Sequence, residues 1–217
     1  MAQQLIVEGK DAIVFANLLK KRGLKPPLGY ETKQKFSNDF VKQAGSVSQV
    51  NFTLKNTLRQ PDITNIGIVV DANNVGAKKR LDELLQVTTT TLNQTFQDKA
   101  QLTSRGFTAQ ILPNLKVGIW VMPNNKENGY LEHFLLQLIE NDNELLLFAR
   151  EKVEELISKG FRKFSKVKKE KAILHTYLAF QKSPGLPMGT AIEANYIDAL
   201  SEKAANFEEW FKSTFVL

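Results

Sequence analysis

Acidic and amide side chains follow three apolar stretches of the sequence, and their types and spacing suit a site for a hard cation. The first stretch leads into Glu8, the second into Asp71 and Asn73, and the third into Asn124, with Glu132 shortly beyond. Carboxylate and amide oxygens are the ligands that Mg²⁺ and Mn²⁺ prefer. A cation held there would polarise a phosphodiester and activate a water molecule for attack. The residues therefore predict metal-assisted phosphoryl transfer.

Four neighbouring residues are expected to support these ligands: Gly9, Asp11, Asn125 and His133. Simpler roles compete with the metal site. Asp11 also suits a helix cap, and Glu132 suits the free amides of a first helical turn. Asp71 and Asn73 would also close an ordinary strand-to-helix turn. Glu8 is harder to explain in this way, because a carboxylate beside a buried strand needs a partner.

The composition narrows the chemistry further. The chain of 217 residues has no cysteine and two histidines, which excludes disulfides, thiolate zinc sites and cysteine nucleophiles. His133 and His175 are far apart in the sequence, and His175 is expected to be a packed or surface residue. The sequence has no phosphate-binding loop, dinucleotide-binding glycine motif or serine nucleophile elbow. Any metal is therefore expected on oxygen ligands.

A basic segment, residues 159–171, carries the densest charge in the chain, and Phe161 and Phe164 are interleaved with its cations. These cations are Lys159, Arg162, Lys163, Lys166, Lys168, Lys169 and Lys171. Such a cluster predicts salt-dependent contacts with the phosphates of DNA or RNA. The alternative is a solvated connection between two helices. The net charge of +6 permits nucleic-acid binding but does not require it.

Three apolar runs predict the strands that position the acidic and amide residues, at residues 4–7, 66–70 and 117–122. The latter two are rich in β-branched residues and nearly continuous, as expected in a parallel sheet covered on both faces. Residues 107–112 form a further candidate strand. In such a sheet the carboxyl ends of parallel strands meet at one edge, where ligands bind.

Helical patterns separate the predicted strands. Apolar residues at helical spacing follow the first strand up to Gly23, and further helices are predicted over residues 46–59 and from residue 75. The four threonines at 88–91 are poor helix formers and predict a break. Strands alternating with helices indicate an α/β fold with right-handed crossovers.

From Gly129 onward the pattern predicts helices alone. We expect an α/β body over residues 1–125 and a helical C-terminal portion over 126–217 packed against it, with one single domain as the alternative. No targeting sequence or membrane-spanning stretch is recognised, and no membrane association is expected. The protein is therefore expected to be cytoplasmic.

Two short motifs carry a family resemblance. VEGKD at residues 7–11 and IVVDAN at residues 68–73 resemble the TOPRIM domain of topoisomerases, primases and OLD-type nucleases. The stretches 117–136 and 179–198 are similar to an uncharacterised bacterial group of TOPRIM-like proteins, so the likeness spans most of the chain. The resemblance implies a Rossmann-like fold with a small, mostly parallel sheet and a site for phosphoryl transfer that depends on Mg²⁺ or Mn²⁺.

The resemblance also implies roles for individual residues. Glu8 takes the place of the family's catalytic glutamate, and Asp71 that of the first aspartate of its D-x-D pair. Asn73 stands where the second aspartate belongs, and Asn124 where the bacterial group usually carries an acid. An amide oxygen still coordinates a cation but supplies less charge, so we expect weakened metal affinity.

Two functions follow as expectations. The first is metal-dependent hydrolysis of phosphodiester bonds in DNA or RNA, as in a nuclease. The alternative is a catalytically degenerate TOPRIM-like protein that binds nucleic acid or a protein partner without turnover. A small-molecule phosphate hydrolase using the same edge is a third, for which the sequence offers no substrate signal. A homo-oligomer has no support in the sequence.

Overall fold

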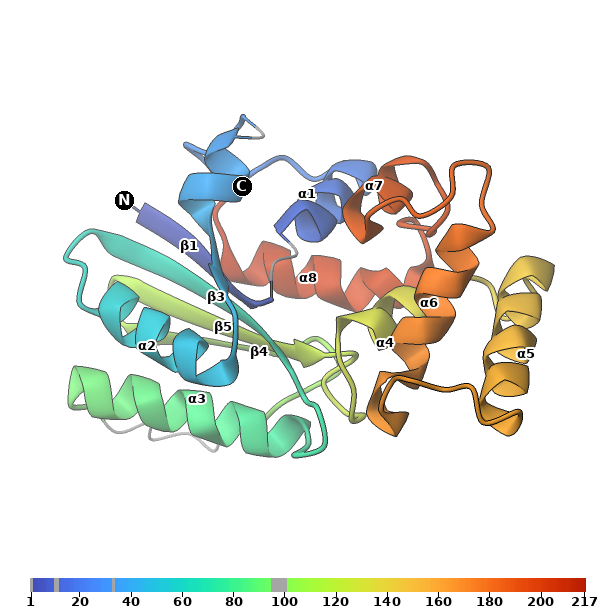
Figure 1. Ribbon diagram of the computed structural model, residues 1–217. Coiled ribbons are helices and arrows are strands. Elements are labelled where there is room, and N and C mark those ends of the chain that lie inside the picture. The colour runs from blue at the N-terminus through green and yellow to red at the C-terminus, as the bar shows by residue number, and fades with distance from the viewer. Residues whose placement is uncertain (1, 10–11, 33, 95–100) are drawn as a thin grey trace.

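The computed structural model describes residues 2–9, 12–32, 34–94 and 101–217, and within them a central sheet has helices on both faces (Figure 1). Its five strands are β1 (Ala2–Glu8), β2 (Val41–Ala44), β3 (Ile63–Asp71), β4 (Phe107–Leu112) and β5 (Leu115–Met122). They lie in the order β2-β1-β3-β5-β4. Four strands run parallel, and β4 pairs antiparallel to β5 at one edge. The predicted mostly parallel α/β sheet is confirmed.

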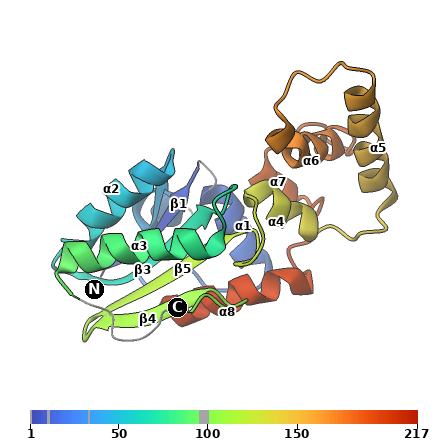
Figure 2. The ribbon, with the colours of Figure 1, turned by 90° about the horizontal axis from the view of Figure 1, so that it is seen from below.

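Two helices cover one face of the sheet, α2 (Val47–Leu58) and α3 (Ala77–Leu92) (Figure 2). The side chain of Ser46 caps α2 by accepting a hydrogen bond from the amide of Gln49. The predicted break at the threonines is wrong, because α3 runs through them to Leu92. The Thr88 hydroxyl donates to the Leu84 carbonyl of the preceding turn, so this polar group is satisfied inside the helix.

The remaining helices are α1 (Ala12–Lys21), α4 (Leu131–Gln137), α5 (Glu144–Ser158), α6 (Lys169–Ala179), α7 (Met188–Glu193) and α8 (Ala205–Thr214). Short π- or 3₁₀-helical turns occur at Lys35–Phe40, Lys166–Lys168 and Glu202–Ala204. After Met122 the described chain contains only helices and connections, which confirms the predicted change at Gly129. None of the described helices has the length and apolar character needed to cross a membrane.

Alternation along the strands divides the core between the two faces. In β1, Leu5 and Val7 pack with α1 and the C-terminal helices, whereas Ile6 packs with α2 and α3. Because both faces are covered, every one of these side chains is buried, which explains the nearly continuous apolar runs.

Helix α8 returns to the sheet over two paired glycines. Gly67 of β3 lies opposite Gly118 of β5. A Cβ atom at Gly118 would overlap the side chain of Thr214, and one at Gly67 would approach a ring carbon of Phe215 at 2.8 Å. The absence of side chains on these two residues therefore lets the end of α8 lie directly on the strands.

Candidate functional site

Glu8 and Asp71 come together at the carboxyl ends of two neighbouring parallel strands. Glu8 ends β1 and Asp71 ends β3, and the two strands are paired in parallel up to Val7 and Val69. The Glu8 Oε2 atom accepts a hydrogen bond from the backbone amide of Asp71 at 3.1 Å. Both residues are partly exposed, at the edge where ligands bind in parallel sheets.

Asp71 is also tied to both adjacent helices. Its Oδ1 atom accepts a hydrogen bond from the amide of Leu131 at 3.2 Å, in the first turn of α4. Its carbonyl accepts a hydrogen bond from Nε of Arg80 at 3.1 Å, and the same guanidinium binds Glu83 at 2.7 Å. The sequence analysis did not identify Arg80. The one signal in the sequence that could have identified Arg80 is its place near the start of the helix that follows β3, nine residues after Asp71.

Asn73 joins the loops that follow β3 and β5. Its backbone exchanges two hydrogen bonds with Gly129, at 2.8 and 3.2 Å. Asn73 adopts a positive φ of 49°, a left-handed conformation that asparagine tolerates better than most residues. This backbone role gives a physical reason for an asparagine at a position where the resemblance implies an aspartate.

Asn124 and Asn125 use their side-chain oxygens within the turn after β5. Oδ1 of Asn124 accepts backbone hydrogen bonds from Lys126 at 3.3 Å and Glu127 at 3.0 Å. Asn125 is buried, and its Oδ1 accepts from the amide of Val121 at 2.7 Å. Both amides therefore shape the loop that carries them, and neither is brought against Glu8 by a contact that the structure shows.

Glu132 is engaged by the basic segment. Its side chain is only 8% exposed, and Oε1 lies 2.6 Å from Nζ of Lys171, whose own side chain is half exposed. A buried carboxylate requires such a partner, because its desolvation would otherwise be costly. Two residues predicted for different roles, one for metal and one for phosphate, thus form a single ion pair between α4 and α6.

His133 and Tyr130 form the start of α4. Nδ1 of His133 accepts the backbone amide of Tyr130 at 3.4 Å, and their rings meet edge to face at 4.3 Å. Burial lowers the pKa of His133, which favours the neutral imidazole that this cap requires. The Tyr130 hydroxyl donates to the carbonyl of Val167, and burial raises the pKa of that phenol. Tyr130 therefore fixes the basic segment beside the strand ends.

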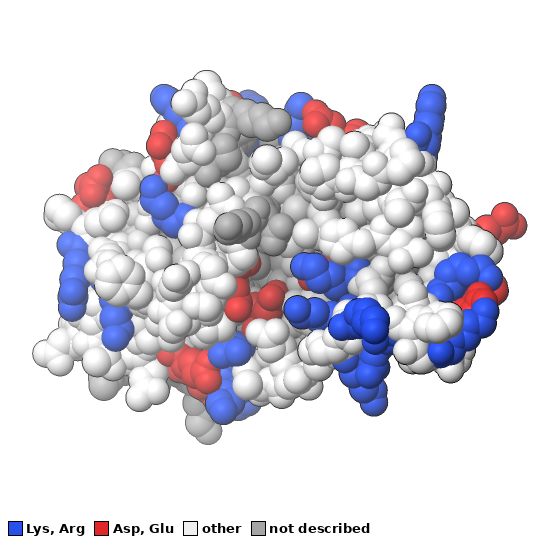
Figure 3. All heavy atoms as spheres, in the orientation of Figure 1, with Lys and Arg blue, Asp and Glu red and all other residues white. Residues whose placement is uncertain are grey.

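A cavity of about 230 Å³ lies at this junction. It is lined by Asn73, Asn74, Asn128, Gly129, Tyr130, His133, Lys166, Val167, Lys169 and Glu170. Acidic and basic side chains gather next to each other near the middle of the face in Figure 3, where the sheet meets the C-terminal helices. The fold therefore brings the basic segment, distant in sequence, to the edge predicted from the strand ends.

The cations of the basic segment fall into two groups. Lys159, Lys169 and Lys171 pair with Glu155, Glu154 and Glu132 respectively. Hydrogen bonds from Lys159 and Lys152 lower the pKa of Glu155 to about 2. Arg162, Lys163, Lys166 and Lys168 are exposed and have no acidic partner among the described residues. Only this second group remains available for phosphate.

The donor set of the site suits a hard cation that takes few of its ligands from the protein. Among the described residues, which exclude Asp11, no group of three or more histidines or acids is placed to hold a metal ion. A preformed cage of protein ligands is therefore absent from this part of the chain. Mg²⁺, however, is commonly bound by one or two carboxylates together with water and substrate phosphates. Glu8 and Asp71 fit that arrangement.

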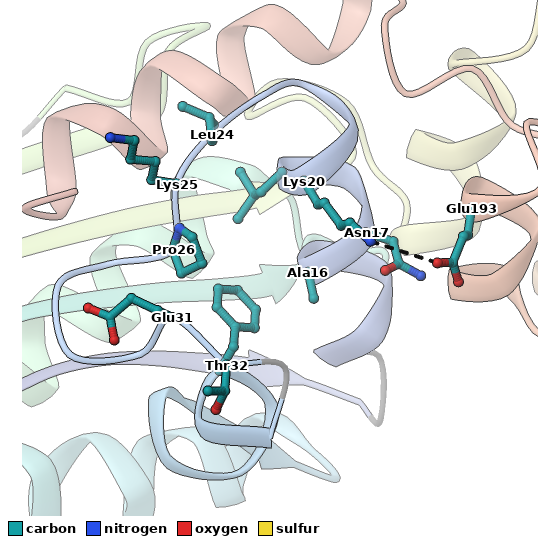
Figure 4. Close-up of a pocket in the computed structure, with 11 residues that line it drawn as sticks. Ala16, Asn17, Lys20, Leu24, Lys25, Pro26, Glu31, Thr32 and Glu193 are labelled. Atoms are coloured by element: carbon teal, nitrogen blue, oxygen red, sulfur yellow. Dashed lines mark ion pairs between the residues drawn. The ribbon is translucent and has the colours of Figure 1, made fainter.

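A larger cavity, of about 450 Å³, lies between α1, the connection that follows it and α7 (Figure 4). Its walls are apolar at Leu24, Pro26 and Phe36, and Lys20 and Glu193 form an ion pair of 3.9 Å across one end. Two lysines and two glutamates line it, so their formal charges cancel. It lacks the positive excess that a phosphate group requires, and it includes none of the predicted site residues.

Comparison with known proteins identifies the family. A family model described as "Protein of unknown function (DUF3226)" matches residues 2–216, so the chain belongs to the DUF3226 family. No curated protein and no solved structure matches the chain.

Proposed function

We propose that this DUF3226 protein hydrolyses phosphodiester bonds of nucleic acid at the edge formed by the ends of β1 and β3. The observation that carries the proposal is the pairing of Glu8 with Asp71 across two parallel strands, with a 3.1 Å hydrogen bond joining them. The TOPRIM-like motifs contain these same two residues. Lys166 at the adjoining cavity, with the neighbouring exposed cations of the basic segment, would supply the positive charge that a phosphate backbone needs.

Asp71 and Lys166 each have one task in this proposal, and Glu8 has two. Asp71 is oriented by Leu131 and Arg80, and with Glu8 it would hold Mg²⁺ or Mn²⁺. When bound, the cation supplies Lewis-acid polarisation of the phosphodiester. Glu8 accepts a proton from the attacking water, and Lys166 contacts the phosphate at the cavity rim.

The direct test is cleavage of single- and double-stranded DNA and RNA by purified protein with Mg²⁺, Mn²⁺ or EDTA. Glu8→Gln and Asp71→Asn preserve size while removing charge, so both should reduce cleavage by at least about 100-fold, as expected for a catalytic proton acceptor. Glu193→Gln is the matched control, because this exposed acid lines the other cavity. Equal cleavage by wild type and Glu8→Gln would remove the assignment.

A second candidate function is binding of nucleic acid without turnover. Specific observations favour it: Glu132 is held by Lys171, and the Asn124 oxygen by its own turn. Two of the four predicted metal ligands are thus occupied by protein groups. This candidate predicts salt-sensitive binding in EDTA and no cleavage with either cation. Calorimetric titration of Mn²⁺ separates the two, because only the first predicts binding that Asp71→Asn abolishes.

A further inference from the structure

The basic segment holds an aromatic ring in solvent. Phe161 is 67% exposed and lies three residues after Ser158, the last residue of α5. Single exposed apolar side chains are common on protein surfaces, so what distinguishes Phe161 is the run of exposed cations that follows it in the chain. No acidic residue occurs between Lys159 and Lys169.

The backbone around Phe161 is fixed by the end of the helix. Gly160 has a φ of 74°, and its amide donates to the carbonyl of Ile157 at 3.0 Å. The amide of Phe161 donates to the carbonyl of Leu156 at 3.1 Å, which completes a Schellman motif. The ring is thus carried on an ordered backbone, which reduces the entropy lost when a ligand stacks on it.

The four cations without acidic partners follow Phe161 closely. Arg162 and Lys163 come next in the chain, and Lys166 and Lys168 lie in the 3₁₀ turn that leads to α6. Lys166 also lines the cavity at the strand ends. In Figure 1 the connection runs from α5 back towards the loop that follows β5. Residues 161–168, which we call the basic path, therefore join the ring to the cavity at the strand ends through a stretch of chain with four cations and no acidic residue.

We infer that this path binds single-stranded nucleic acid, with Phe161 stacking on an unpaired base and the four cations contacting phosphates. This inference rests on the proposed function, whose substrate class it specifies. Single-stranded nucleic acid is bound elsewhere in proteins by basic grooves combined with aromatic stacking platforms. A duplex keeps its bases stacked inside, so it would contact the cations but leave Phe161 unused.

The chemistry of the path favours nucleic acid over an anionic membrane. Exposed apolar side chains within the basic segment are limited to Phe161 and Val167, and the carbonyl of Val167 is held by Tyr130. This is little apolar area for insertion among lipids, which requires a broad apolar helix face. The path also reaches the cavity that Lys166 and Asn73 line, two residues beyond Asp71, and binding to a membrane surface would not account for that placement.

The test is fluorescence anisotropy with labelled oligo(dT), oligo(U) and a duplex of equal length, all in EDTA so that no cleavage occurs. Phe161→Ala should weaken binding of the single strands by roughly fivefold or more and leave duplex binding unchanged. Phe52→Ala is the matched control, because Phe52 is 66% exposed on α2 and lies outside the basic segment. With at most four phosphates neutralised, the salt slope for oligo(dT) should be no steeper than about −3.

A second set of variants, in which lysines are replaced by glutamates, tests the role of the cations in the same binding assay. Lys163→Glu with Lys168→Glu should weaken both single strands and duplex and reduce the salt slope, whereas Lys55→Glu with Lys79→Glu on α2 and α3 should not. Equal binding of single strands by Phe161→Ala and Phe52→Ala overturns the inference.

The outcomes separate this inference from the proposed function. Cleavage that depends on Glu8 but is indifferent to Phe161 leaves the function standing and removes the single-strand surface. Binding of single strands that depends on Phe161, without any cleavage, supports the single-strand surface and removes the proposed hydrolysis. Capture by vesicles of phosphatidylcholine and phosphatidylserine that depends on Phe161, with no oligonucleotide binding, overturns the inference in favour of a membrane surface.

Discussion

The ion pair between Glu132 and Lys171 allows one quantitative test of how the basic segment is joined to the strand-end edge. The perturbation is Lys171→Met, which keeps the aliphatic stem and removes the charge. Removing one partner of a fully buried pair costs about 3–5 kcal/mol, and an exposed pair contributes about 0–1 kcal/mol. Here the Glu132 side chain is 8% exposed and that of Lys171 is 49% exposed, so water reaches one side of the pair. We expect a loss of about 2 kcal/mol.

The assay is urea unfolding of four proteins: wild type, Lys171→Met, Glu132→Gln and the double variant. The double variant should be more stable than the sum of the single changes predicts, with a coupling energy of about 1–2 kcal/mol. Lys168→Met is the matched control, since Lys168 is exposed and lacks an acidic partner in the described part of the chain. Its stability should stay within about 0.5 kcal/mol of wild type. Additive single changes, or equal stability of the two Met variants, would refute the reasoning.

Three further predictions concern other parts of the fold. Gly118→Ala should destabilise the protein by about 1–3 kcal/mol in urea unfolding, because its Cβ would overlap Thr214, and Thr214→Ala should restore part of the loss. Burial lowers the pKa of His133, so stability should be full above its ordinary pKa of 6.5 and fall as the pH drops towards the folded-state value. Unfolding of His133→Gln should lack that decline. Asn125→Ala should cost about 1–3 kcal/mol, because it leaves the buried amide of Val121 without its acceptor; Asn125→Asp, which keeps an acceptor, should cost less.

Three of the four parallel strands, β1, β3 and β5, were predictable from the sequence because burial on both faces leaves continuous apolar runs. Strand β2 was missed, since its four residues, Val41–Ala44, include two polar side chains and lie at an edge of the sheet. The threonine break failed for a different reason. The hydroxyl of Thr88 bonds back to the preceding turn, which satisfies this buried polar group without adding to helix propensity. Packing of the apolar stripe of α3 against the sheet therefore outweighs the low propensity of the threonines.

In the candidate site, some contacts follow from the order of the strands, and others depend on how distant helices pack. The meeting of Glu8 and Asp71 follows from topology alone, because neighbouring parallel strands end at one edge. The pairing of Glu132 with Lys171 depends on how α6 packs against α4, which no local pattern encodes. The left-handed backbone at Asn73 likewise depends on its bridge to Gly129.

The two candidate functions predict opposite effects of Glu8→Gln on nucleic-acid binding in the presence of Mg²⁺. Without a cation, the carboxylates of Glu8 and Asp71 repel an approaching phosphate, and one charge near a protein surface contributes on the order of 1 kcal/mol. If the edge only binds nucleic acid, Glu8→Gln should therefore raise affinity by roughly fivefold, with or without Mg²⁺. If the edge binds the phosphate through a cation, the same substitution should raise affinity in EDTA but lower it in Mg²⁺. An affinity unchanged under both conditions would show that phosphates do not approach Glu8.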